Sequence, residues 1–353
     1  MTPEIKITRT QNSKIKDFDF VNIPPFGSYF TDHMFVADYK DGKWSDLEIK
    51  PLENLSMHPA NLTLHYGQSI FEGMKAFLTN DKKPLLFRPY DHAKRFNRSA
   101  LRMAMPEVPE DLFVEAITQL VKLEKNWIPE KPGSALYIRP FMIAMDDVIG
   151  VKPSVTYKFI IFTMPSGPYY SRPLSLKAAR EYVRAVKGGI GEAKTAGNYG
   201  ASIYPFRLAK ELGFDQLIWL DGFEHKYIQE IGTMNIFFVI GDKVITPELD
   251  GAILKGITRD SIITLLKDRG YTVIERPISV DELMEEFKKG NLKEVFGTGT
   301  AAIVADIYKV EIDDFVMNFD ADKLEVAHFA FNTMNKIRKG EIEDKFGWVH
   351  ILD

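Results

Sequence analysis

The chain has 353 residues, 45% of them hydrophobic and none of them cysteine, and its formal net charge is −4. That length predicts about two domains with sizeable cores, and the lack of cysteine excludes disulfides, thiolate catalysis and cysteine-bound zinc. The balanced charge and the short apolar runs argue against nucleic-acid and membrane partners, because a bilayer span needs roughly 20 apolar residues. The seven histidines lack metal-binding spacing and the N-terminus lacks an apolar signal core, so we expect a cytoplasmic protein without a bound metal.

The first part of the chain, residues 1–167, predicts a small α/β domain. An irregular arm precedes strand-like alternation, which begins at His33. Residues 62–77 are largely apolar but contain two glycines, which usually mark bends or a close backbone approach. The predicted strands cover 33–39, 44–50, 84–88, 135–145 and 156–165, and the predicted helices cover about 90–105 and 110–127.

Glycine and proline interrupt both periodicities after the last of these strands, which predicts an interdomain linker at 168–177. Residues 178–353 are then expected to form a larger C-terminal domain that includes Lys194. The predicted strands of this domain cover 216–220, 227–231, 235–240, 243–246, 272–278 and 292–296, and its predicted helices cover 201–212, 256–266, about 283–290 and about 325–338.

Four features of the sequence are candidates for chemistry. Lys194 lies among small residues that permit the close approach of a planar ligand, and Arg139 interrupts an apolar strand on the same face as Tyr137. Gly256 opens a helix whose free amides suit a phosphate, and 297–302 is a second cluster of small residues with accessible amides. Taken alone, a lysine in a glycine-rich connector is more often inert, and many helices that begin with glycine bind nothing.

These features occur in a characteristic order with several further segments. The full set is 30–34 (FTDHM), 64–66 (LHY), 71–76 (FEGMKA), 137–140 (YIRP), 194–199 (KTAGNY), 230–235 (EIGTMN), 256–259 (GITR) and 297–301 (GTGTA). The chain therefore resembles the branched-chain amino acid aminotransferases, which are pyridoxal-phosphate enzymes. The resemblance extends from about Phe26 to the C-terminal helix, and it implies a mixed α/β (α+β) fold of two domains, fold type IV.

The resemblance also implies how the cofactor, pyridoxal 5'-phosphate, is held. Lys194 would carry the cofactor aldehyde as a Schiff base and later move the proton between the substrate Cα and the cofactor. Glu230 would face the pyridine nitrogen, and Tyr199 would hydrogen-bond the ring hydroxyl. The remaining cofactor-binding residues implied by the resemblance, mostly around the phosphate, are Arg95, Thr233, Ile257, Thr258 and Thr300.

For the substrate, the resemblance implies one pocket that accepts both a branched aliphatic side chain and the side chain of glutamate. The Tyr137 hydroxyl and the amides of Thr300 and Ala301 would bind the α-carboxylate, while Arg139 and Tyr66 would bind the distal carboxylate of glutamate. The apolar lining would come from Phe26, Phe71, Ile149 and Tyr169. Tyr66 and Ile149 would be contributed by the partner subunit of a homodimer, so a monomer would be inactive.

The implied reaction is a ping-pong transfer of the amino group from L-leucine, L-isoleucine or L-valine to 2-oxoglutarate, which gives a branched-chain 2-oxo acid and L-glutamate. Two alternatives share the same fold, a D-amino acid aminotransferase and an aminodeoxychorismate lyase. The Tyr137-x-Arg139 pair and the Phe71-Glu72-Gly73 segment favour the branched-chain group. A third alternative, a pyridoxal-phosphate-binding protein without turnover, is disfavoured because every chemical position is filled.

Overall fold

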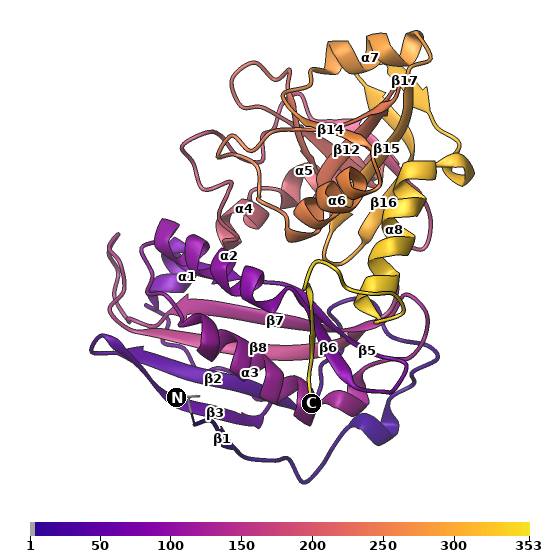
Figure 1. The fold of residues 1–353 in the computed structure, drawn as a ribbon. Coiled ribbons are helices and arrows are strands. Elements are labelled where there is room, and N and C mark those ends of the chain that lie inside the picture. The colour runs from indigo at the N-terminus through magenta and orange to yellow at the C-terminus, as the bar shows by residue number, and fades with distance from the viewer. Residues whose placement is uncertain (1–3) are drawn as a thin grey trace. The chain divides into compact units, whose positions relative to one another are not determined.

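The computed structural model describes residues 4–353, which form two compact units. Unit 1 consists of the chain up to Tyr169 together with Ala193–Ala196 and Lys336–Asp353, and unit 2 consists of Tyr170–Glu192 and Gly197–Asn335 (Figure 1). The segment with Lys194 and the C-terminal tail thus belong with the N-terminal part of the chain, whereas the sequence predicts a single linear division. None of the helices in the described part of the chain is both long and apolar enough to cross a membrane.

Unit 1 contains a nine-stranded sheet, counted over the described residues, in the order β1-β3-β2-β8-β7-β5-β6-β18, with β4 also paired to β7. All neighbours in it are antiparallel except β1 and β3. The strands are β1 Lys6–Ile7, β2 His33–Lys40, β3 Lys43–Pro51, β4 Ser69–Phe71, β5 Met74–Leu78, β6 Pro84–Phe87, β7 Ala135–Ala144, β8 Tyr157–Ser166 and β18 Val349–Ile351.

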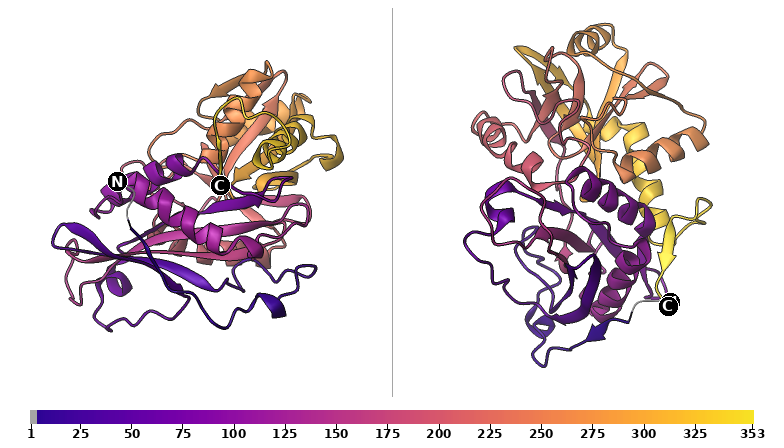
Figure 2. Two further views of the ribbon diagram at one scale, coloured as in Figure 1. Left: turned by 60° about the horizontal axis from the view of Figure 1, so that its bottom comes forward. Right: turned by 90° about the vertical axis from the view of Figure 1, so that its left-hand side faces the viewer.

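Two helices, α2 (Pro89–Arg102) and α3 (Glu110–Leu123), cover one face of this sheet (Figures 1 and 2). A proline at the first position suits α2 because its fixed φ matches the helix and its missing N–H is not needed there. The apolar stripe of α3 packs against the face of the sheet that carries Leu136 and Ile138. Because side chains alternate along a strand, Tyr137, which lies between these two residues on β7, faces the other way. The shorter helices of unit 1 are η1 Ile15–Asp17, α1 Leu62–Tyr66 and η2 Lys125–Trp127.

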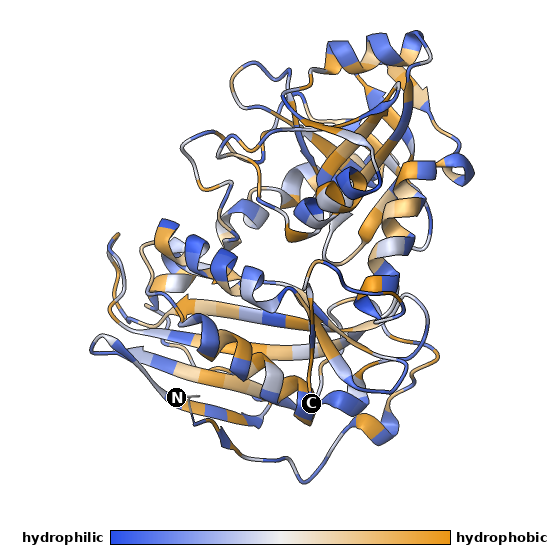
Figure 3. Cartoon of the chain, in the orientation of Figure 1, coloured by the Kyte–Doolittle hydropathy of each residue, from blue (hydrophilic) through white to orange (hydrophobic). Residues whose placement is uncertain are grey.

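Unit 2 contains a second sheet, which also has nine strands within the described residues, in the order β11-β10-β9-β16-β15-β12-β13-β14, with β17 paired to β16. Apolar residues dominate its inner strands, as they do in unit 1 (Figure 3). The strands are β9 Leu174–Ala178, β10 Gln216–Leu220, β11 Ile228–Ile231, β12 Asn235–Ile240, β13 Lys243–Thr246, β14 Thr272–Glu275, β15 Leu292–Gly299, β16 Ile303–Ile312 and β17 Phe315–Asn318. The helices are α4 Ala196–Gly200, α5 Ile203–Glu211, α6 Ile257–Asp268, α7 Val280–Lys288, η3 Ala321–Lys323 and α8 Glu325–Arg338, of which α4 and α8 each run across the division between the units.

Most elements lie where the sequence predicts them, and the helix predicted at about 325–338 is confirmed by α8. Three strands of unit 2, β9, β16 and β17, were not predicted. Residues 174–177 were expected to be linker, but they form most of β9, because Leu174, Leu176 and Ala178 alternate into the core between two parallel neighbours. Strand β16 follows directly from the turn that ends β15, so the small residues there join two strands of one sheet.

Candidate active site

The main chain around Lys194 is fixed within unit 1. The Lys194 carbonyl accepts a hydrogen bond from the Phe71 amide at 2.9 Å, and the Lys194 amide donates to the Ser99 hydroxyl at 2.9 Å. Thr195 pairs with Ile70 in an isolated β-bridge, and its hydroxyl donates to a carbonyl of β4 at 2.7 Å. The segment therefore lies along β4, and the Lys194 Nζ is 4.6 Å from the centre of the Phe71 ring.

Arg95 is brought close to Lys194 through Ser99. The Ser99 hydroxyl, which receives the Lys194 amide, itself donates to the Arg95 carbonyl one helical turn earlier in α2 at 3.1 Å. The Arg95 side chain is buried and donates two hydrogen bonds to the carboxylate of Glu72, from Nε to one oxygen at 2.6 Å and from Nη2 to the other at 2.8 Å. His92 Nδ1 lies 2.9 Å from the same carboxylate.

Glu72 is a buried carboxylate that the sequence analysis did not assign to a role. Burial alone would raise its pKa, but the charge and hydrogen bonds of Arg95, with a further bond from His92, outweigh burial and hold the pKa of Glu72 well below its usual range. The group is thus ionised, and it fixes the orientation of the guanidinium. An internal partner therefore fixes the orientation of the Arg95 side chain.

Five of the predicted substrate residues gather in unit 1. Arg139 lies 4.8 Å from the Phe71 ring centre, and its Nη2 donates to the Tyr137 hydroxyl at 3.2 Å. Phe26 packs edge-on against Tyr137 and Tyr169, with ring centres 4.9 and 5.2 Å apart. Lys194 also lies over Phe71, so the lysine, the aromatic residues and Arg139 are all held together within unit 1.

Tyr66 and Ile149 are not part of that cluster, and both are exposed, Ile149 at 61%. Tyr66 is the last residue of α1. Ile149 lies in the loop after β7, just after Asp147, which forms an isolated β-bridge with Asn61. Their predicted contribution to the site of a partner subunit stays a prediction.

Unit 2 carries Glu230, which is buried on β11 within a network of donors. The Leu254 amide donates to one carboxylate oxygen at 2.7 Å and the Asn235 side chain donates to the same oxygen at 3.3 Å. The other oxygen lies 2.9 Å from Nε of Arg184, an ion pair in which the N–H is poorly aligned for a hydrogen bond. Arg184 in turn donates to the carbonyls of Ala252 and Gly191, so the network ties Glu230 to the loop before Lys194.

The same network leads to the beginning of α6. The Asn235 side chain also donates to the Leu254 carbonyl at 2.9 Å, and a Cβ on Gly256 would overlap its side-chain oxygen. Gly256 is therefore needed for close packing at the N-cap of α6, where no side chain caps the first amides. Ile257 and Thr258, the predicted phosphate ligands, are the first two residues of that helix.

The remaining predicted residues of unit 2 lie at turns or on a short helix. Thr233 is exposed in the tight turn between β11 and β12, Thr300 and Ala301 form the turn between β15 and β16, and Tyr199 lies on α4. The β12–β15 register places Asn235 opposite Thr298, so the β15 turn lies on the strand next to the Glu230 network.

Ser99 and Arg184 are functional candidates that the sequence analysis missed. Ser99 is an ordinary helix residue in the sequence, and Arg184 lies in an irregular segment, so neither shows a local signal. Their roles depend on contacts with residues at least 46 positions away, such as Arg184 with Glu230. Only the fold reveals them.

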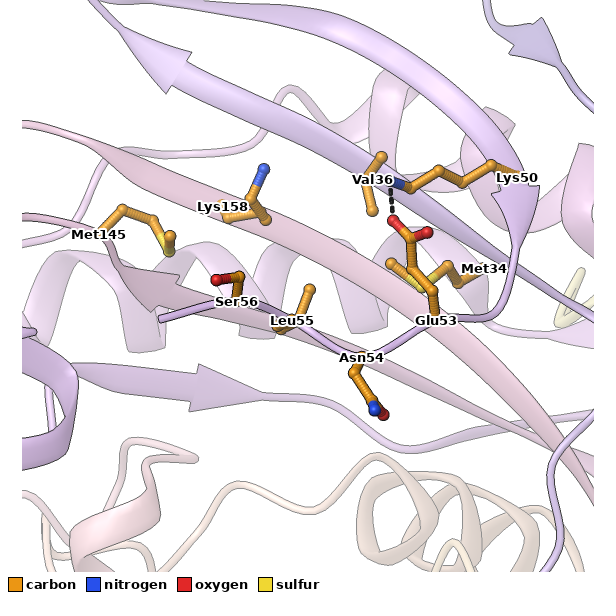
Figure 4. A pocket seen from close by; sticks show the side chains of 9 residues that line it. All are labelled: Met34, Val36, Lys50, Glu53, Asn54, Leu55, Ser56, Met145 and Lys158. Atoms are coloured by element: carbon orange, nitrogen blue, oxygen red, sulfur yellow. Dashed lines mark hydrogen bonds and ion pairs between the residues drawn. The ribbon is translucent and has the colours of Figure 1, made fainter. Parts of the chain in front are cut away.

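A cavity of about 240 Å³ lies elsewhere on unit 1, against β2 and β8 (Figure 4). Lys50 and Glu53 form an ion pair at its rim. Its lining residues are Met34, Val36, Lys50, Glu53, Asn54, Leu55, Ser56, Met145 and Lys158. None of the predicted site residues is among them, so the cavity is separate from the cluster around Lys194.

The chain is similar to known proteins in both sequence and structure. A family model for amino-transferase class IV matches residues 69–310. The chain is 45% identical to branched-chain-amino-acid aminotransferase 2 of Bacillus subtilis, covering 98% of this chain and 96% of that protein, and 47% identical to branched-chain-amino-acid transaminase 1 of the same organism, covering 92% of each.

Among solved structures, the branched-chain amino acid aminotransferase from Escherichia coli matches with a TM-score of 0.74 and 27% identity, covering 91% of this chain and 99% of that chain. The predicted fold, a mixed α/β protein of fold type IV, is confirmed by this likeness. The chain belongs to the class IV aminotransferase family.

Proposed function

We propose that the protein is a branched-chain amino acid transaminase, which transfers the amino group of L-leucine, L-isoleucine or L-valine to 2-oxoglutarate. The observation that carries this proposal is the group in unit 1 that joins Lys194, Phe71, Tyr137 and Arg139. It combines an amine, an aromatic surface for a branched side chain and a cation for a distal carboxylate. Relatives named for this activity are 45% and 47% identical to the chain over most of its length.

The residues present fit pyridoxal 5'-phosphate as the cofactor. A phosphate suits Arg95, whose guanidinium is already oriented by Glu72, and the amides of Ile257 and Thr258, which begin a helix without a side-chain cap. A pyridine nitrogen suits Glu230, which has a preformed set of donors. Tyr199, Thr233 and Thr300 are proposed as further contacts.

When bound, pyridoxal phosphate supplies an aromatic ring that accepts the electrons left on a substrate carbon after it loses its proton. The Nζ of Lys194 is proposed to hold the cofactor aldehyde and to carry the proton to and from the substrate Cα. Glu230 would hold the ring nitrogen, and Arg184 and the Leu254 amide fix the orientation of its carboxylate. The hydrogen bonds from Phe71 and to Ser99 restrict where the lysine can reach.

We further propose that Tyr137, with the amides of Thr300 and Ala301, binds the α-carboxylate. Arg139 would meet the distal carboxylate of glutamate, while Phe26, Phe71 and Tyr169 line the apolar pocket. The guanidinium of Arg139 lies over the rings of Phe71 and Tyr137, and these contacts stabilise its charge when no anion is bound. A branched aliphatic group can therefore occupy the same space as the side chain of glutamate.

A spectral titration tests the function. Protein loaded with pyridoxal phosphate should change its absorbance from the aldehyde to the amine form when L-leucine is added, and 2-oxoglutarate should reverse the change. The matched Lys194→Ala variant should show neither response. A wild-type protein that responds to D-alanine but not to L-leucine would instead support the D-amino acid aminotransferase.

We also propose a homodimer in which Tyr66 and Ile149 of one subunit contribute to the site of the other. Mixing variant subunits tests this arrangement. Lys194→Ala and Tyr66→Ala homodimers should each be nearly inactive. After mixed refolding or co-expression, a hybrid should regain one complete site and up to half of the wild-type activity per hybrid. Hybrids with no recovered activity would show that Tyr66 acts within its own subunit.

A further inference from the structure

Residues 15–29 form a loop whose two ends are held together at its base. The chain enters the loop after Lys14 and leaves it at Phe30, and the Lys14 Nζ donates to the carbonyls of Phe30 and Thr31 at 3.1 and 3.2 Å. A compact surface loop whose ends lie close together is an Ω-loop, a class of loop that is frequently functional. This loop carries Phe26, one of the predicted residues of the apolar pocket.

Asp32 closes the base of the loop. It is buried, and its carboxylate accepts hydrogen bonds from the Ser13 hydroxyl at 2.5 Å and from the Lys14 amide at 2.9 Å, at the point where the loop begins. The same carboxylate accepts a third hydrogen bond from the indole N–H of Trp127 at 3.1 Å. Burial alone would raise the pKa of Asp32, but these hydrogen bonds outweigh it and lower the pKa. The carboxylate is therefore ionised at neutral pH, which strengthens each of the three bonds.

Trp127 is also the surface on which the interior of the loop packs. Its ring centre lies 5.3, 6.3 and 5.9 Å from those of Phe18, Phe20 and Tyr29, which come from the two ends of the loop. Trp127 itself is buried in the short helix η2. One indole thus donates a hydrogen bond to the base of the loop and makes the apolar contacts of its interior.

The tip of the loop is a tight turn that presents Phe26. The Ser28 amide and the Ser28 hydroxyl both donate to the Pro25 carbonyl, at 3.1 and 2.6 Å. Gly27, the third residue of this turn, has a φ of +82°, which is characteristic of a type II turn and which glycine adopts without strain. The turn therefore fixes the backbone on both sides of Phe26, whose ring packs against Tyr137.

The chain that follows the loop is fixed to the sheet that carries Tyr137. The Thr31 amide donates to the Thr163 carbonyl at 3.0 Å, and the two threonine hydroxyls are hydrogen-bonded at 2.6 Å. Thr163 lies on β8 directly opposite Ile138, the residue after Tyr137 on β7. The base of the loop therefore has a defined position relative to Tyr137.

We propose that Asp32, together with Trp127, is a positioning residue that sets the preference for long substrate side chains by holding Phe26 in the apolar pocket. This inference rests on the proposed function, because it takes Phe26 as part of that pocket. Asp32 acts through the loop and does not touch the substrate. A long branched side chain gains its binding energy from apolar contact with the pocket wall, whereas a short side chain makes little of that contact.

The test compares two amino donors on the holoenzyme, L-leucine and L-2-aminobutyrate, whose side chain is smaller. Asp32→Asn keeps the shape of the side chain but removes the charged acceptor, so it should raise KM for L-leucine about fivefold and change kcat less than about twofold. KM for L-2-aminobutyrate should change less than about twofold. Asp38→Asn is the matched control, because it alters an acid on the adjoining strand β2 that is paired with Lys158.

A double-mutant cycle shows whether Asp32 acts through Phe26. Phe26→Ala alone should raise KM for L-leucine about tenfold, because it removes one wall of the pocket. Asp32→Asn added to Phe26→Ala should raise KM less than about twofold further, since the side chain that it positions is already gone. Additive increases would show that Asp32 affects the pocket by another route, and they would overturn the proposal.

Trp127→Phe tests the proposal independently if Asp32→Asn does not fold. It keeps an aromatic ring but removes the N–H, so it should raise KM for L-leucine about two- to threefold. Hydrogen exchange gives a readout without turnover, because the backbone amides of residues 18–29 should exchange faster in both variants while those of β8 stay unchanged. Unchanged exchange in the loop, or equal losses for both amino donors, would contradict the role of Asp32.

The two levels of inference fail differently. A wild-type enzyme that does not use L-leucine contradicts the proposed function itself. A wild-type enzyme that uses L-leucine, with Asp32 variants that lose both donors equally, contradicts only the positioning role of Asp32.

Discussion

Lys75→Met should make the protein more stable near neutral pH, because the lysine is held where its charge is unfavourable. Its pKa falls from 10.5 to about 7 on folding. The unfolded chain therefore binds more protons than the folded protein between pH 7 and pH 10.5, so this group makes stability rise with pH through that window. At pH 7 the penalty, relative to pH above 10.5, is about 4 kcal/mol at 1.36 kcal/mol per pKa unit.

Methionine keeps the length and the apolar stem but carries no charge. It loses any hydrogen bond that the amine makes, about 1 kcal/mol, so we expect a net gain of about 3 kcal/mol at pH 7. At pH 9.5 only about 1 kcal/mol of the penalty remains, so the gain should nearly vanish.

Urea unfolding of wild type, Lys75→Met and the control Lys83→Met, which alters an exposed lysine paired with Asp353, measures this directly in one cofactor state and at both pH values. A variant that is less stable at pH 7, or a difference that is the same at both pH values, would refute the reasoning. Such a result would mean that Lys75 is stabilised by partners stronger than its desolvation.

Three further predictions concern the site. Ser99→Ala removes the acceptor of the Lys194 amide, so unfolding should show a loss of about 1–3 kcal/mol of stability. Steady-state kinetics should show that kcat falls by a larger factor than KM rises, whereas Ser99→Thr should retain activity. Gly73→Ala places a Cβ against the Tyr137 hydroxyl, so it should raise KM for L-leucine at least tenfold, and an unchanged KM would show that Tyr137 can move freely. Arg139→Met should reduce kcat/KM for L-glutamate by at least tenfold more than for L-leucine, and equal losses would contradict its assignment to the distal carboxylate.

The sequence predicted the elements whose signals are local. A helix such as α8 has an apolar stripe over its full length, and β10 to β13 have turn residues between short apolar runs. Strand β9 was missed because its five residues directly follow Pro173 and have no turn of their own. Its parallel pairing with β10 and β16 is non-local, and a short apolar run does not reveal its partners.

The candidate site shows the same limit. Lys194, Glu230 and Arg139 could be proposed from residue type and from a resemblance carried by ordered motifs. Ser99 and Arg184 could not, because their importance depends on a hydrogen bond and an ion pair that join distant positions.

Two buried arginines of unit 1, Arg95 and Arg338, differ in their hydrogen-bond partners. Arg95 has a permanent internal counter-charge in Glu72, which suits a residue that must be rigid before and after a ligand binds. Arg338 has two nitrogens without a hydrogen-bond partner in the described part of the chain, and its charge opposes that of Lys75. The counter-charge of Glu72 therefore keeps Arg95 in one orientation, as a site for an anion requires.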